Sequence, residues 1–279
     1  MYRKRWIKSC RVRAIDKGDV YMKKFVLLLI IMSIIVPQSL YAEMIGNPGE
    51  QVGKKNLFVG LEYSSILHNF DLDTSGVDTS SERMSLKVTT GLNDWFDIFL
   101  KAGGASLMID YKKQSNAIKN FDSNMNIGFG GGGRLRLLNF VDSETRVFLQ
   151  GGAFYFTSSD DAEWQTNAIS TRTIERDMKW IDMYAALGVA KRMDFIDLNF
   201  GLGFSQVKWW MNDIEITQTG NAKTSKTLDE RDSFESKTPL FGFVGIDFIL
   251  PHEYRLSAQA GVRNIDEAQF SVAISQGLE

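Results

Sequence analysis

The chain has 279 residues, and its 32 basic and 34 acidic side chains give a formal net charge of −2. A hydrophobic content of 44% excludes a disordered chain, and the near balance of charge gives no reason to expect nucleic acid as a partner. The length allows one or two domains, and one cysteine, Cys10, excludes a disulfide framework.

The N-terminal part has the pattern of an export signal. Lys23 and Lys24 precede an uncharged apolar run at residues 25–36, and Ala42 ends the polar stretch that follows. The run has twelve residues, whereas a membrane-spanning helix needs about 20. We expect an upstream extension foreign to the native chain at 1–21, a signal peptide at 22–42 and a periplasmic segment at 43–53.

From Leu57 onward, side chains alternate between apolar and polar with a period of two, which is typical of strands. In the first segment Leu57, Leu61 and Tyr63 lie on one face and Glu62 on the other. In no segment does the apolar face carry a charge, and the charged residues of the segments lie on the other face. The ten segments, in chain order, are 57–63, 83–92, 96–102, 127–137, 146–155, 180–189, 196–205, 240–248, 255–263 and 270–275.

The connectors indicate which face points outward. Short turns alternate with long polar connectors at 65–80, 107–121, 157–177 and 207–236, which is the pattern of a transmembrane barrel. Aromatic residues flank the short turns and lie at the opposite strand ends, as in interfacial girdles: Trp95, Phe96, Phe140, Phe195 and Tyr254, with Tyr63 and Tyr155 opposite.

We therefore predict an all-β fold for residues 54–279: a closed antiparallel up-and-down transmembrane β-barrel with short periplasmic turns and long outer loops. About ten strands are expected. Twelve remain possible because residues 213–217 alternate and could form a hairpin outside the membrane. The alternative fold is a soluble exported barrel with the two faces inverted, which would bind a small ligand.

The strand–turn–strand sequence of residues 91–98 (GLNDWFDI) and the glycine-rich strand of residues 128–136 resemble the small outer-membrane β-barrel proteins of Gram-negative bacteria. The resemblance covers most of residues 54–279. It implies residence in the outer membrane, contact with outer-membrane lipid and lipopolysaccharide, and insertion by the barrel-assembly machinery. These matching segments are architectural and assign no activity.

The charged face predicts a narrow lumen lined by paired charges. A belt near the short turns should contain Asp97, Arg136, Arg146, Asp197, Asp247 and Arg255, with Asp247 facing Arg255 across a hairpin. The upper lumen should contain Glu62, Arg83, Lys87, Lys101, Arg134, Asp182 and Arg263. The expected role is structural, or that of a passive small-solute pore. The alternative is surface interaction or adhesion through the long loops, with Trp209 and Trp210 at the base of the longest.

Other motifs are weaker. Asp71, Asp73, Ser75 and Glu82 have the spacing of a calcium loop, but strands flank them where helices should lie. Gly128, Gly130 and Gly133 match a nucleotide-binding spacing without the helix that would hold phosphate, so we expect them to make room for lumen side chains. His68 and His252 should lie at opposite barrel ends. We expect neither enzymatic activity nor a cofactor.

Overall fold

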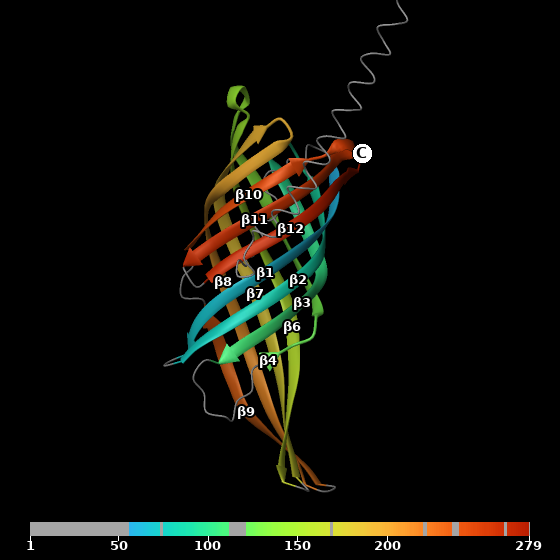
Figure 1. Cartoon of the computed structure of the whole chain (residues 1–279), viewed down its shortest axis with the longest axis vertical. Helices are drawn as coiled ribbons and strands as arrows, with labels where there is room; N and C mark the ends of the chain where they lie inside the picture. Colours follow the sequence, from blue (N-terminus) through green and yellow to red (C-terminus); the bar gives the residue numbers. More distant parts are fainter. Residues whose placement is uncertain are drawn as a thin grey trace, which may run out of the picture. The chain divides into compact units, whose positions relative to one another are not determined.

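The computed structural model (Figure 1) describes residues 56–72, 75–111, 121–167, 170–219, 222–235, 240–264 and 267–278. The predicted extension, signal peptide and periplasmic segment, residues 1–53, lie outside the described residues. The elements are β1 (Leu57–Leu72), β2 (Ser75–Gly91), β3 (Phe96–Tyr111), β4 (Phe121–Asp122), β5 (Asn126–Phe140), β6 (Thr145–Asn167), β7 (Ser170–Met193), β8 (Ile196–Thr219), β9 (Ala222–Glu235), β10 (Leu240–Ile249), β11 (Tyr254–Asn264) and β12 (Glu267–Leu278), with short 3-10 turns at Val141–Ser143 and Pro251–Glu253.

Ten strands close into a barrel in which every pairing is antiparallel. Going round the wall, the strands are β1, β2, β3, β5, β6, β7, β8, β10, β11 and β12, and β12 pairs with β1. Closure leaves no unpaired edge around the wall, as a lipid environment requires. The ten-stranded barrel expected from the sequence is confirmed.

β9 lies outside this ring. It pairs with the segment Lys208–Thr219 of β8, whereas β10 pairs with the segment Ile196–Phe204 of the same strand. β8 therefore changes neighbour along its length. The hairpin considered for residues 213–217 is present as the outer parts of β8 and β9.

The short turns are where the sequence places them. In the first, the Asn93 side-chain oxygen accepts hydrogen bonds from the backbone N–H groups of Trp95 and Phe96, both at 2.8 Å. Glu144, Asp194 and His252 adopt left-handed backbone conformations in three other turns. These tight reversals fix the register of the strands that they join.

The expectation of long loops at the opposite end is wrong for three of the four connectors. Residues 67–72 of β1 pair with residues 75–80 of β2, and residues 157–167 and 170–177 continue β6 and β7. Residues 207–219 and 222–235 belong to β8 and β9. Pairing between neighbouring strands satisfies backbone N–H and C=O groups that an irregular loop would leave to water. These segments therefore continue as β-strands.

The outward face of the barrel is apolar. Leu61, Met84, Leu100, Phe129 and Leu202 are all exposed, Leu202 to 72%, while their neighbours in sequence point inward and are mostly buried. An apolar outer belt with charges inside is the arrangement for lipid. The alternative of a soluble barrel with inverted faces is therefore wrong, and the strands are transmembrane. No helix in the described part of the chain is long and apolar enough to span a membrane.

The interior is more apolar than the sequence led us to expect. One buried cluster is Ala105, Leu107, Ile109, Phe121, Phe154, Phe156, Met178, Trp180, Val207, Trp209 and Met211. A second is Phe148, Ala186, Ala190, Phe241 and Phe243. Glycines face several of these rings, and a Cβ on Gly128 would lie 2.6 Å from Cζ of Phe154. Gly128 thus makes room for a lumen side chain, as predicted.

Candidate functional site in the barrel lumen

The lumen has two unlike walls. The buried apolar side chains just described come from β3, β4, β6, β7, β8 and β10. The strands β11, β12, β1 and β2 instead contribute many small or polar buried residues, among them Ser64, Ser81, Ser85, Thr89, Ser257, Gln259, Gln269 and Ser271. Long charged side chains on this polar wall extend across the lumen and form ion pairs or hydrogen bonds with residues of the other wall.

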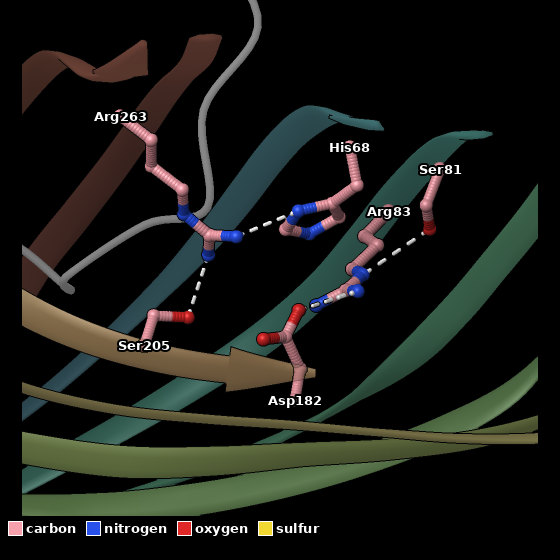
Figure 2. A network of polar contacts seen from close by, with 6 residues as sticks. All are labelled: His68, Ser81, Arg83, Asp182, Ser205 and Arg263. Atoms are coloured by element: carbon pink, nitrogen blue, oxygen red, sulfur yellow. Dashed lines mark hydrogen bonds and ion pairs between the residues drawn. The ribbon is translucent and has the colours of Figure 1, made fainter. Parts of the chain in front are cut away.

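Arg83 of β2 makes the clearest of these cross-lumen contacts (Figure 2). Its Nη2 lies 3.0 Å from Oδ2 of Asp182 on β7, which is fully buried, and its Nε donates to Ser81 Oγ at 3.3 Å. The guanidinium also lies over Phe154 and Phe156, at 5.0 and 5.3 Å from the ring centroids. A planar, permanently charged group suits this combination of a carboxylate and aromatic faces.

Arg263 of β11 forms a second junction beside the first (Figure 2). Its Nη1 lies 2.7 Å from His68 Nδ1, its Nη2 donates to Ser205 Oγ at 2.6 Å, and Glu267 Oε2 is 3.7 Å from Nη1. Arginine has no acceptor, so Nδ1 must accept, and the imidazole is neutral with its proton on Nε2. His68 is therefore a buried residue of the lumen.

A third group surrounds Phe99 of β3. The ammonium groups of Lys87 and Lys101 lie 5.3 and 5.6 Å from the centroid of this ring. The two lysines are directly opposite each other on β2 and β3, where like charges repel. Glu62 of β1 offsets that repulsion, because its Oε1 lies 2.5 Å from Lys101 Nζ.

The belt near the short turns is only partly paired in the expected way. Arg146 Nη2 lies 2.7 Å from Asp197 Oδ1. Asp247 accepts a hydrogen bond from Asn199 at 3.3 Å, and Arg255 lies over the ring of Phe58 at 4.9 Å. Half-buried Arg136 is on the lumen face of β5.

Two expected placements in this region are wrong. The hairpin between β10 and β11 is centred on His252, so Asp247 lies opposite Ser257 and Arg255 opposite Ile249. Asp247 and Arg255 are therefore two residues out of register. Arg134, assigned to the upper lumen, lies opposite Asp97 in the belt, with Nε 3.8 Å from Oδ2.

Two cavities within the lumen are very small. One of about 20 Å³ is lined by Glu62, Ser64, Arg83, Ser85, Phe99, Lys101, Ala153, Phe154 and Tyr184. One of about 10 Å³ is lined by Phe58, Gly60, Leu61, Glu62, Lys87, Thr89, Ser257, Ala273 and Ser275. Each has room for about one water molecule.

The calcium-loop residues do not form a loop. β2 begins at Ser75, and Glu82 lies within it, exposed and opposite Ser106. Seven residues of extended strand separate Ser75 from Glu82 by roughly 23 Å, too far for both to hold one ion. Asp73 lies outside the described residues, and the described part of the chain contains no cluster of metal ligands.

Some lumen residues were not among those predicted. Buried Arg176 and Glu267 belong to the charged lining, and Trp209 lies fully buried inside instead of at the base of a surface loop. The prediction of a polar connector at residues 157–177 leaves Arg176 out of the expected lumen lining. Extending the period of two from Trp180 back to Arg176 would have placed it on the lumen face.

No protein-family model matches the sequence, and no curated protein does either. Solved structures do match the fold at low similarity. The translocator domain of the autotransporter NalP from Neisseria meningitidis has 9% identity and a TM-score of 0.45, over 95% of this chain and 98% of that one. The outer membrane protease OmpT from Escherichia coli has 11% identity and a TM-score of 0.40, over 80% and 92%. Ail, the attachment invasion locus protein of Yersinia pestis, has 11% identity and a TM-score of 0.28, over 80% and 97%.

Proposed function

We propose that this protein is a structural outer-membrane β-barrel whose lumen is closed to solutes. The observation that supports the proposal is the filled interior, in which the lumen cavities lined by Glu62 measure only about 10 and 20 Å³. Ten strands are close to the eight at which side chains already fill a barrel, and far from the sixteen of an open porin. We further propose that it resides in the outer membrane, contacts lipid and lipopolysaccharide through the apolar belt and is not an enzyme.

Planar-bilayer recording of the purified protein tests this proposal. The first step is to recover the protein from the outer-membrane fraction with a gel mobility that shifts on boiling, which identifies a folded barrel. We expect no stepwise conductance in concentrated KCl and no swelling of sugar-loaded vesicles, with a known porin as the positive control. Regular conductance steps from the unmodified protein would contradict the closed lumen.

A second candidate is surface interaction through the strands that leave the barrel. β6, β7 and β8 have 23, 24 and 24 residues, and with β9 they continue past the ends of β1, β2 and β3 (Figure 1). We define these outer parts of β6 to β9 as the outer sheet. It is a paired structure, so it can present a fixed surface at a lower ordering cost than loops of the same length.

Complementation separates the two candidates. A strain that lacks the protein would receive either the full chain or a chain in which short turns replace residues 159–175 and 211–233. If the trimmed barrel restores the barrier to detergents and large antibiotics as well as the full chain does, the barrel alone carries the function. If it inserts normally but fails to restore the barrier, the outer sheet is required.

A further inference from the structure

Glu62 lines both lumen cavities. The cavity on one side includes Phe58, Thr89 and Ser275, which lie toward the strand ends at the short turns, and the other includes Ser64, Ser85 and Arg83. Besides Glu62 the two cavities share no lining residue. The carboxylate therefore lies between two small spaces: one along the polar wall, and one where β1 and β2 face residues of β3, β6 and β7.

The bonding of Glu62 is incomplete. Its Oε1 is paired with Lys101, but Oε2 is buried and receives no hydrogen bond from the protein. A buried carboxylate oxygen without a partner is costly, and a water molecule in an adjacent polar space would satisfy it. Both cavities are large enough for that water, so a space that can hold a water molecule lies on either side of Glu62.

We propose that the Glu62–Lys101 ion pair is the gate of a narrow hydrated path along the polar wall, and that this path passes water and small inorganic anions when the pair is broken. Small hydroxyl side chains line the path on both sides of the pair: Ser64 and Ser85 on one, Thr89, Ser257 and Ser275 on the other. These groups can hydrogen-bond to water without filling the space.

The charges around the gate determine which ions would pass. Lys87 and Lys101 line the cavities beside Glu62, the acidic residue of that lining, whereas Arg83 lines one cavity but is paired with Asp182. Removing the carboxylate both joins the two cavities and leaves a basic constriction. A ring of basic side chains favours anions over cations.

The test compares Glu62→Ala with Asp97→Ala in planar bilayers and in osmotic shrinkage of vesicles. Asp97 is a matched control because it is also a buried lumen carboxylate beside a basic partner, Arg134. Unlike Glu62, Asp97 lines neither cavity. We expect Glu62→Ala to raise water permeability at least several-fold and to give conductance whose reversal potential in a KCl gradient indicates chloride preference. Asp97→Ala should behave like the unmodified protein.

The boiling-dependent gel shift establishes that each variant inserts. If Glu62→Ala does not fold, Lys101→Met breaks the same pair from the other side and should raise water permeability in the same way. Unchanged permeability in an inserted gate variant, an equal rise in Asp97→Ala, or cation preference in Glu62→Ala would overturn the proposal. Conductance by the unmodified protein would instead contradict the closed-lumen function, so the two failures are distinguishable.

Discussion

At the scale of single residues, stability depends most on the charges that cross the lumen. Asp182 is fully buried, and Arg83 is the cation with which it is paired. A buried ion pair adds little by itself, but removal of one partner leaves an uncompensated charge. The Arg83 side chain also covers two aromatic rings, so its loss removes packing as well as charge.

We therefore expect Arg83→Ala to lower the free energy of unfolding by about 3–5 kcal/mol, the range for breaking a buried pair. Urea unfolding in lipid vesicles, followed by tryptophan fluorescence, measures the change. Glu82→Ala is the control, because Glu82 is adjacent in β2 but points outward and is exposed. Equal effects of the two substitutions would show that the Arg83–Asp182 contact is unimportant.

At the level of single residues, the sequence predicts which side of a strand faces the lumen, but it does not predict which residue lies opposite on the neighbouring strand. Alternation placed Glu62, Arg83 and Asp182 inside without error, because a period of two leaves one choice of face per strand. It could not pair Asp247 with the correct neighbour. The register there depends on where a 3-10 turn is centred, and an error of one residue in the centre moves the partner by two.

At the scale of strands, close packing between neighbouring strands determines which glycines can be replaced by a residue with a Cβ atom. A Cβ on Gly132 of β5 would meet the carbonyl oxygen of Gly151 on β6 and lie 2.6 Å from Cζ of Phe99. Gly242 of β10 is different, since the nearest atoms to its Cβ would be 3.8 and 4.0 Å away. The two glycines therefore make a matched pair for substitution.

Gly132→Ala should destabilise the barrel by about 1–3 kcal/mol, because backbone and ring must both shift to admit the methyl group. Gly242→Ala should leave stability unchanged or slightly raised, since alanine loses less conformational freedom than glycine on folding. The temperature at which the gel mobility shifts reports both effects. A lower shift temperature for Gly242→Ala than for Gly132→Ala would contradict the packing argument.

Strand lengths were the least predictable feature of the elements. The apolar alternation stops where the chain leaves the lipid, so the sequence indicates only the membrane-facing part of β6, β7 and β8. Beyond that point most residues are polar, although Ile216 of β8 is buried, and pairing with the neighbouring strand decides the structure. Hydrophobic periodicity contains no information on that pairing.

At the scale of the whole barrel, the short turns and the outer sheet lie at opposite ends of the strands. Outer-membrane barrels keep short turns in the periplasm and long connections outside the cell. We therefore expect Asp142, in a short turn, to face the periplasm, and Thr224, near the tip between β8 and β9, to face the exterior. Both residues are exposed.

Cysteine labelling on intact cells checks this orientation. In a Cys10→Ser background the chain has no other cysteine, so each introduced thiol is labelled alone. A membrane-impermeant maleimide should label Thr224→Cys in intact cells and Asp142→Cys only after the outer membrane is permeabilised. Labelling of Asp142→Cys in intact cells, with protection of Thr224→Cys, would reverse the assignment.

The barrel itself was the most predictable level. Ten apolar faces, alternating connector lengths and the need to close a strand edge in lipid lead to one architecture. The aromatic filling was not foreseen, although Phe99, Phe148, Trp180 and Phe241 were on the polar face of their segments. Which of those side chains meet across the lumen depends on strand stagger, and local sequence does not contain that quantity.

The pairing of β7 with β8 has a mechanical consequence. The two strands run in unbroken register over their full 24 residues, from the turn beside Asp194 to the tip of the outer sheet. Because this pairing has no bulge or break between the barrel wall and the tip, we expect a displacement of the tip to be passed directly to the wall.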